Sequence, residues 1–169
     1  RSSAGVDHTR GGVTLHADFA HQDAKALRGD NLNAPDPTGI RPDTQFGNVV
    51  QVESTGRAQL NALTTSVQYN NQKTATFFRF NYTVGYARDN TDGGFFLPVD
   101  PRQPGAEWGP SSNDARHRFS GNFSQLFFGR RINAQTYWQF NSALPYTVTT
   151  GIDSNHDGVF NERPDGIGR

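Results

Sequence analysis

The stretch "TATFFRFNYTVGYARDN", residues 74–90, alternates apolar and polar side chains with a period of two. Its even positions are Phe78, Phe80, Tyr82, Val84 and Tyr86, and its odd positions are Arg79, Asn81, Thr83 and Gly85. Successive side chains of a β-strand point to opposite faces, so this segment predicts a strand with one apolar and one polar face. The alternation lasts about ten residues, which is the length of a tilted strand that crosses a bilayer.

Two later segments show the same alternation, and two earlier ones show it more weakly. In residues 116–128 one face carries Phe119, Gly121, Phe123 and Phe127, interrupted by Gln125; in residues 131–146 one face carries Ile132, Ala134, Thr136, Trp138 and Phe140. The weaker faces are Val13, Leu15, Ala17 and Phe19 in residues 12–22, and Leu63, Val67 and Tyr69 in residues 57–70. We therefore predict an all-β fold in one domain, with strands near residues 12–27, 57–70, 74–89, 115–128 and 131–148.

The connections between these strands are alternately short and long. Residues 70–73 and 128–131 are tight turns, whereas the Gly-, Pro- and Asp-rich stretches 28–56, 90–114 and 149–169 are long loops. Residues 47–56 have the pattern of another strand, but a crossing strand there would put one long loop on the wrong side. We interpret them as an extended continuation of that loop. Short turns on one side and long extracellular loops on the other are typical of an antiparallel β-meander in an outer-membrane barrel.

A soluble β-sandwich is the alternative, because its strands also alternate. The membrane is favoured because the apolar faces consist mostly of Phe, Tyr and Trp, the opposite faces carry Arg, Asn, Gln and Ser, and the loops are long. The expected location is the cell outer membrane. The side chains expected to face lipid are Phe78, Phe80, Tyr82, Val84, Tyr86, Phe119, Phe123, Phe127, Ile132, Trp138 and Phe140.

Composition excludes several classes of protein. The 169 residues contain no Cys, which removes thiol catalysis, zinc–thiolate sites and disulfides, and their formal net charge of zero gives no reason to expect a nucleic-acid partner. There is no Met and no signal-peptide pattern, so we expect a piece or a processed product of a longer protein. Five strands also cannot close a barrel, which takes at least about eight. The predicted meander is therefore one part of a larger barrel wall.

Three stretches carry specific motifs. They are "LRGDNLNAPDPTGIRPDTQFGNVVQVESTGRAQLNAL" (27–63), "DARHRFSGNFS" (114–124) and "ALPYTVTTGIDSNHDGVFNERPDGIGR" (143–169), the last with PYT, TTG, D-x-N-x-D-G, N-x-RP and GIGR in order. Together they resemble the C-terminal part of the barrel in Oar-like TonB-dependent outer-membrane receptors, over nearly the whole chain. The resemblance implies a barrel of about 22 strands with an N-terminal plug. Receptors of this kind move bulky substrates and are driven by a TonB-type energy complex.

The partners implied by this resemblance are outer-membrane lipid, the rest of the barrel with its plug, and the TonB-type complex. The plug and the TonB-contacting segment do not occur in these residues, so transport is expected of the parent protein, in import or in an export-related role. Two other functions stay open from the sequence. One is a small outer-membrane barrel with a structural or adhesive role, and the other is a secreted calcium-dependent β-sandwich that binds a ligand.

The sequence offers little for catalysis, so we expect no enzyme activity and no certain cofactor. The five histidines lack ligand spacing, and His16 and His21 lie on opposite faces of one predicted strand, where they could not share a metal. One loop carries spread carboxylates that we expect to form a solvated surface with Arg88 and Arg102, namely Asp89, Asp92, Asp100, Glu107 and Asp114. The aromatic residues Phe95, Phe96 and Trp108 of the same loop either contact a ligand or pack the loop on itself.

The segment "DSNHDGVFNERPDG", residues 153–166, has the spacing of a calcium loop. Oxygen-bearing side chains at alternate positions and a glycine for the sharp turn suit a hard cation. The expected ligands are the side chains of Asp153, Asn155, Asp157 and Asn161 and the carbonyl of Val159, and Gly158 is expected to have a positive φ. The twelfth position is Pro164 rather than a glutamate, which excludes a true EF-hand. The alternative is a turn whose Asp and Asn side chains bond their own backbone.

Overall fold

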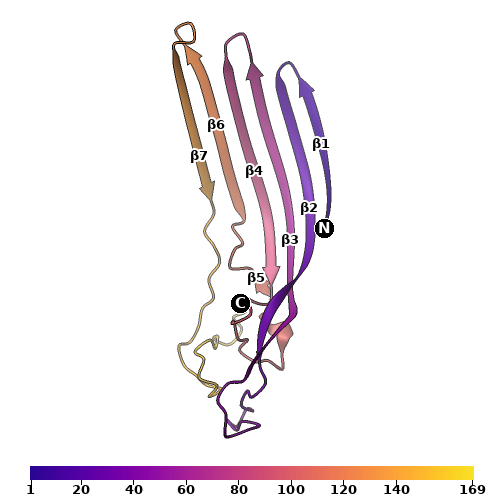
Figure 1. Ribbon diagram of the computed structural model, residues 1–169, viewed down its shortest axis with the longest axis vertical. Coiled ribbons are helices and arrows are strands. Elements are labelled where there is room, and N and C mark those ends of the chain that lie inside the picture. Colours follow the sequence, from indigo (N-terminus) through magenta and orange to yellow (C-terminus); the bar gives the residue numbers. More distant parts are fainter. The chain divides into compact units, whose positions relative to one another are not determined.

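The computed structural model describes residues 1–169 and is an all-β fold built on one sheet (Figure 1). The strands are β1 (Ser2–Arg10), β2 (Val13–Asn31), β3 (Val50–Asn71), β4 (Thr76–Asp89), β5 (Gly109–Pro110), β6 (His117–Phe127) and β7 (Ile132–Asn141), and a 3-10 turn, η1, covers Pro104–Glu107. The strands lie side by side in the order β1-β2-β3-β4-β6-β7, with the short β5 paired to β4. No helix here has the length and apolar character needed to cross a bilayer.

The chain forms two compact units. The first, the strand unit, comprises residues 1–22, 60–86 and 115–144, and contains the paired strands with their tight turns. The second, the loop unit, comprises residues 23–59, 87–114 and 145–169, and contains the three long connections with the strand ends that enter them. Each unit has its own pattern of burial.

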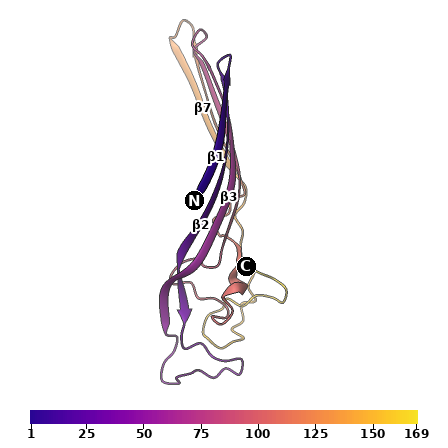
Figure 2. The same cartoon turned by 90° about the vertical axis from the view of Figure 1, so that its right-hand side faces the viewer.

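The register of the strand unit places the predicted apolar positions on one face. In the β4–β6 pair Phe78 lies opposite Phe123, and Tyr82 lies opposite Phe119. In the β6–β7 pair Phe119 lies opposite Phe140. Directly opposed residues of an antiparallel pair point to the same side of the sheet, so the apolar faces of the three strands form one surface, as the alternation predicted. Figure 2 shows these strands edge-on in a single layer.

This single layer rules out the β-sandwich that the sequence left open. A sandwich buries the apolar face of each sheet against a second sheet. Here no hydrophobic residue is buried, and Phe140 is 64% exposed. The apolar face of the strand unit therefore has no protein layer upon it.

The opposite face of the strand unit carries cross-strand polar contacts. The hydroxyls of Thr64 and Thr83 lie 3.1 Å apart across β3 and β4. The Nε of Arg79 donates to Gln68 at 3.0 Å across the same pair. Because these side chains satisfy one another across strands, the face can be hydrated without unpaired groups.

One glycine on the apolar face is required by its neighbour. Gly121 of β6 lies opposite Trp138 of β7, and a Cβ at this position would collide with the Trp138 indole. Phe78 approaches the same indole, with ring centroids 6.3 Å apart. The indole thus covers the glycine, which explains why a small residue interrupts a run of aromatic positions.

Strand β1 was not among the predicted strands. It pairs with β2 through a two-residue turn at Gly11 and Gly12, whose φ values of 60° and 82° suit the tight hairpin turns that favour glycine. Its sequence, "SSAGVDHTR", is mostly small and polar, so it carries almost no alternation. Its strand conformation depends on pairing with β2 rather than on its own pattern.

The strand bounds also differ from those predicted at the long connections. Strand β3 begins at Val50, so residues 50–56, assigned to a loop by the sequence, are strand; their β-branched Val50 and Val52 favour this conformation. Strand β7 ends at Asn141 rather than near residue 148. Pro145 follows closely, and proline cannot donate to a ladder.

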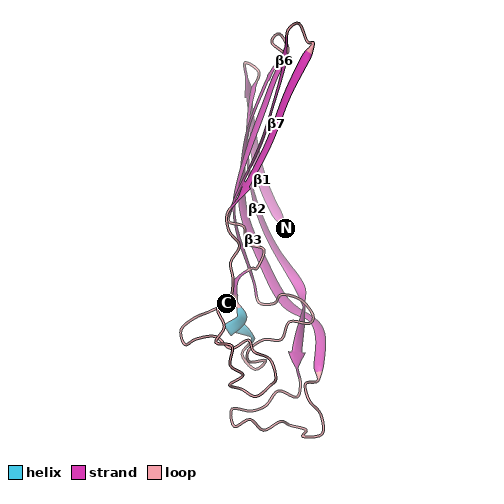
Figure 3. Ribbon diagram, turned by 90° about the vertical axis from the view of Figure 1, so that its left-hand side faces the viewer, coloured by secondary structure: helices cyan, strands magenta, loops and turns pink.

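The loop unit is held together by polar groups. Asn33, 4% exposed, donates from its amide to the carbonyls of Asp43 (2.9 Å), Phe46 (3.0 Å) and Gly47 (2.9 Å), and its Oδ1 accepts from the Asp43 N–H at 2.8 Å. One side chain thus bonds the start of the 33–47 segment to its end. Figure 3 shows the loops of this unit, the strand ends that enter them and the single 3-10 turn.

Candidate functional site

The predicted lipid-facing residues of β4, β6 and β7 share the apolar face of the strand unit. Within this face Tyr82 and Phe119 stack with ring centroids 4.6 Å apart, and Phe80 lies 6.2 Å from Phe119. Near the β6 start, the Tyr82 hydroxyl lies 2.8 Å from Nδ1 of His117, and the Arg116 guanidinium lies 4.3 Å from the Tyr86 ring centroid. An aromatic surface with polar groups at one end is the composition of a membrane interface girdle.

The histidines do not form a metal site. His16 lies 2.7 Å from Asp7 and His21 lies 2.7 Å from Asn61, so the two rings are engaged separately. No group of three or more His, Asp or Glu side chains is arranged to hold a metal by itself.

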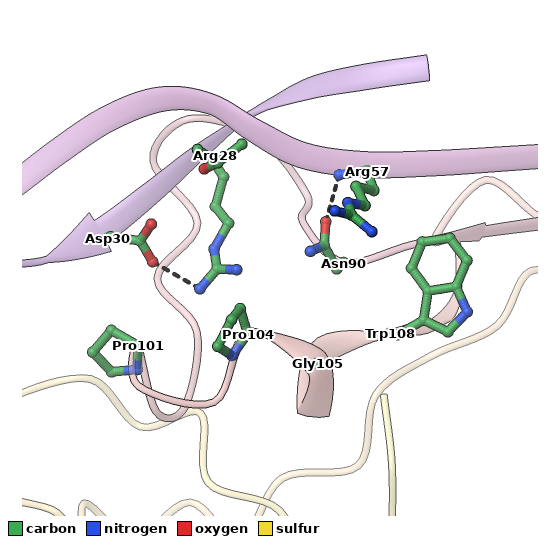
Figure 4. Close-up of a pocket in the computed structure, with 9 residues that line it drawn as sticks. Arg28, Asp30, Arg57, Asn90, Pro101, Pro104, Gly105 and Trp108 are labelled. Atoms are coloured by element: carbon green, nitrogen blue, oxygen red, sulfur yellow. Dashed lines mark hydrogen bonds and ion pairs between the residues drawn. The ribbon is translucent and has the colours of Figure 1, made fainter. Parts of the chain in front are cut away.

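The loop unit contains a cavity of about 520 Å³ (Figure 4). Strand ends and one loop build it, with β2 and β3 on one side and the turn η1 on the other. Its lining residues are Arg28, Asp30, Thr55, Arg57, Asn90, Pro101, Pro104, Gly105 and Trp108. Figure 4 shows Arg28 and Asp30 at one end, Arg57 beside Asn90 in the middle, and Trp108 at the other end.

The cavity has more hydrogen-bond donors than acceptors. Arg28 is 3% exposed and donates to Asp30 at 2.7 Å, while its Nε is buried without a partner. The Oδ1 of Asn90 is already used, because it accepts from the Arg57 N–H at 2.7 Å. Two guanidinium groups against one carboxylate leave a positive excess, which suits an anionic group on a ligand.

Glu107 fixes the turn that lines this cavity. Its side chain is 1% exposed, pairs with Arg163, and accepts from the Val99 N–H at 3.0 Å. Asp114 is also buried, at 4% exposed, so the expected solvated surface of carboxylates is wrong for these two residues. Loop folding brings Arg163 to Glu107 from 56 residues away, which no local pattern could indicate.

Two further arginines of the loop unit are also paired. Arg102 donates from Nε to Asp100 at 2.9 Å and from its terminal nitrogen to the Pro35 carbonyl at 3.0 Å. Arg169 pairs with Asp89 at 2.6 Å and with Asp92. The three long loops are thus joined by charged contacts, which stabilise the walls of the cavity.

The aromatic residues of the 90–114 loop have three different environments. Trp108 lines the cavity. Phe96 packs within the unit, under the Arg169 guanidinium at 5.3 Å from the ring centroid. Phe95 is 94% exposed and packs on nothing. Packing of the loop on itself is therefore seen for Phe96, and a ligand contact by Trp108 stays a prediction.

The predicted calcium loop is folded around its own Asp and Asn side chains. Asp153 accepts from the N–H groups of Asp157 (3.1 Å) and Gly158 (2.9 Å), and Asn155 Oδ1 accepts from the Asp157 N–H at 2.9 Å. Asp157 Oδ1 accepts from the Val159 N–H at 2.7 Å. Gly158 has φ 84°, as predicted. These bonds are those of the self-bonded turn. They also bring the carboxylates of Asp153 and Asp157 into the same loop.

Glu162 is a member of this cluster that the sequence did not indicate. Its Oε1 accepts from the N–H groups of Ser154 (3.1 Å) and Asn155 (3.3 Å), and its Oε2 is buried without a partner. Burial raises the pKa of the Asp157 carboxyl above its ordinary value, and the charges of Asp153 and Glu162 add to the effect. Only the loop fold places Glu162 here, because its spacing from Asp153 matches no standard ligand position.

The comparisons with known proteins agree with this architecture. The family model described as an outer membrane beta barrel domain matches residues 11–169. No curated protein and no solved structure matches the chain. The matched range covers every long strand except β1, and its alternating strands, tight turns and long loops are those of a membrane barrel wall. The chain belongs to the outer membrane beta barrel domain family and forms part of a barrel wall in the cell outer membrane.

Proposed function

We propose that the chain supplies wall strands and extracellular ligand-facing loops to a TonB-dependent outer-membrane receptor that transports its ligand. The observation that carries this proposal is the cavity of about 520 Å³ in the loop unit. A barrel with only a structural role has no need of a buried arginine aimed into a cavity. An unpartnered buried donor is costly unless a ligand or water satisfies it, and Arg28 Nε is such a donor.

The lining residues suggest which ligands the receptor takes. Arg28 and Arg57 offer donors to a carboxylate or phosphate group, and Trp108 offers an apolar ring for stacking. A cavity of this volume has the size of an ordinary small-molecule site. The proposed ligand therefore carries an anionic group beside a planar or apolar part.

The resemblance to Oar-like receptors supports energy coupling by a TonB-type complex. The test is site-specific photo-crosslinking of the whole receptor to TonB in living cells. The expected result is an adduct between TonB and the TonB-contacting segment of the receptor. This adduct should be lost when that segment is deleted. A receptor that forms no adduct at any position of its periplasmic surface would show that it is not TonB-dependent.

A structural or adhesive barrel is the second candidate, favoured by one observation. Phe95 and Tyr146 of the long loops are 94% and 86% exposed, as residues that contact another surface would be. One experiment with whole cells distinguishes the two functions. If adhesion is the function, the double variant Phe95→Ser and Tyr146→Ser loses attachment of the cells to surfaces. If the protein is a TonB-dependent receptor, the same variant still crosslinks to TonB as the wild type does.

A further inference from the structure

The cluster around Asp157 concentrates buried negative charge without a compensating cation. Asp157 is 3% exposed and Glu162 is 6% exposed. No ion pair joins either carboxylate to a basic side chain of the loop unit. Arg41 reaches this loop, but it donates to the backbone carbonyls of His156 (3.3 Å) and Asp157 (3.1 Å). Burying carboxylates is unfavourable unless they are paired or coordinate a metal.

Two oxygens of consecutive residues, Asn161 and Glu162, lack the partners that buried oxygens normally have. Glu162 Oε2 is buried and accepts no hydrogen bond, although the other oxygen of the same carboxylate accepts two. Asn161 Oδ1 is also buried without a partner, while the amide nitrogen of the same side chain donates to the Leu97 carbonyl at 2.9 Å. Buried polar atoms of this kind call for an explanation, and an ion bound beside them is one.

We propose that residues 153–162 form a calcium site in which Asp157 and Glu162 supply the carboxylates. Calcium accepts six to eight oxygen ligands of mixed type, so amide and carbonyl oxygens can complete a site that lacks a third free carboxylate. The remaining candidates are the side chains of Asp153, Asn155 and Asn161 and the carbonyl of Val159. Glu162 takes the place of the glutamate that the twelfth position of an EF-hand would supply.

A bound cation would also connect two of the long loops. Asn155 donates to the Val99 carbonyl at 3.1 Å, and Asn161 donates to the Leu97 carbonyl. Both asparagines belong to the calcium loop, and both acceptors belong to the 90–114 loop. A cation that neutralises Asp157 and Glu162 would therefore also hold in place the two asparagines that join the loops within the unit.

The test uses two isosteric variants. Glu162→Gln and Asp157→Asn remove one charge each, while keeping an acceptor oxygen for the N–H groups that these side chains bind. The self-bonded turn therefore survives in both. Asp165→Asn, an exposed carboxylate of the same segment, is the matched control.

The measurement is calorimetric titration of calcium into the whole outer-membrane protein in detergent. Wild type and Asp165→Asn are expected to bind with a Kd of about 10⁻⁴ to 10⁻³ M, as extracellular calcium modules do. Glu162→Gln and Asp157→Asn are expected to bind at least ~10-fold more weakly, because each loses a charged ligand. No calcium heat in the wild type, or equal affinity in wild type and Glu162→Gln, would overturn the proposal and leave a self-bonded turn.

Discussion

The two units of this chain bury opposite kinds of residues. The strand unit buries no hydrophobic side chain, and its aromatic face remains exposed. The loop unit contains every buried polar or charged residue of the chain, among them Arg28, Asn33 and Glu107. A protein in water would arrange these kinds of residues in the opposite way. The exposed aromatic face of the strand unit is what a lipid-facing barrel wall predicts, whereas the loop unit is held together by hydrogen bonds and ion pairs.

The largest expected loss of stability comes from breaking the buried ion pair between Glu107 and Arg163 in the loop unit. Glu107→Gln leaves Arg163 buried without its counter-charge, which costs about 3–5 kcal/mol of local stability. Hydrogen exchange of peptides covering residues 97–110 and 160–169 measures the loss.

The matched control is Asp100→Asn, whose partner Arg102 is 51% exposed at its side chain. Exposed pairs contribute about 0–1 kcal/mol, so exchange in this variant is expected to change little. Equal exchange in the two variants would show that the Glu107 pair does not hold the loops.

A charge placed on the aromatic face of the strand unit is expected to cause the next largest loss of stability. Phe80→Arg places a guanidinium toward lipid, at an expected cost of about 2–4 kcal/mol near the bilayer midplane. Asn81→Arg, one residue along the strand, faces the other way and is expected to cost much less. Urea unfolding of the whole barrel in lipid vesicles measures both. If Asn81→Arg proved the more damaging, the assignment of faces would be reversed.

Acid is expected to loosen one turn of the loop unit, with the smallest effect. The Thr38 hydroxyl, followed by the Ile40 N–H, holds the pKa of the Asp36 carboxyl below its ordinary value of 3.8. The folded carboxyl thus binds protons less tightly than the unfolded one. Its contribution to stability is complete well above pH 3.8 and is lost as the pH falls through the lower folded value.

A spin label at position 40, where Ile40 is 63% exposed, reports this loosening through its mobility. The mobility is expected to stay constant between about pH 7 and pH 5 and to rise below about pH 4. In Asp36→Asn, which carries no titrating group at this position, the rise should disappear. The same rise in both proteins would assign the change to another group.

The strand unit could be predicted from the sequence because its information is local. Residues 74–90 alternate, and alternation alone fixes which side chains share a face. The exception is β1, whose small polar residues carry no pattern and which becomes a strand only beside β2. Residues 50–56 form a strand, although the order of short turns and long loops predicted a loop there.

The candidate sites were less predictable, because each is built from residues that lie far apart in the sequence. The sequence motif predicts the calcium loop at residues 153–161, but Glu162 joins this loop only through the fold. The cavity draws Arg28 from β2, Arg57 from β3 and Trp108 from a loop, and nothing in the three local sequences connects them. Burial of Glu107 depends on a partner near the end of the chain. Polar contacts between loops have no sequence period, so they require the structure.

The aromatic face of the strand unit is expected to contact lipid, and the opposite face is expected to contact water. This chain has no Cys, so a single Cys introduced here can carry a spin label in the whole protein once any Cys elsewhere is replaced. Labels placed in turn at Phe80, Asn81, Asn122 and Phe123 are exposed to oxygen, which dissolves in lipid, and to a water-soluble nickel complex. We expect oxygen access at Phe80 and Phe123 and nickel access at Asn81 and Asn122. Equal access at all four positions, or the reverse alternation, would contradict the claim.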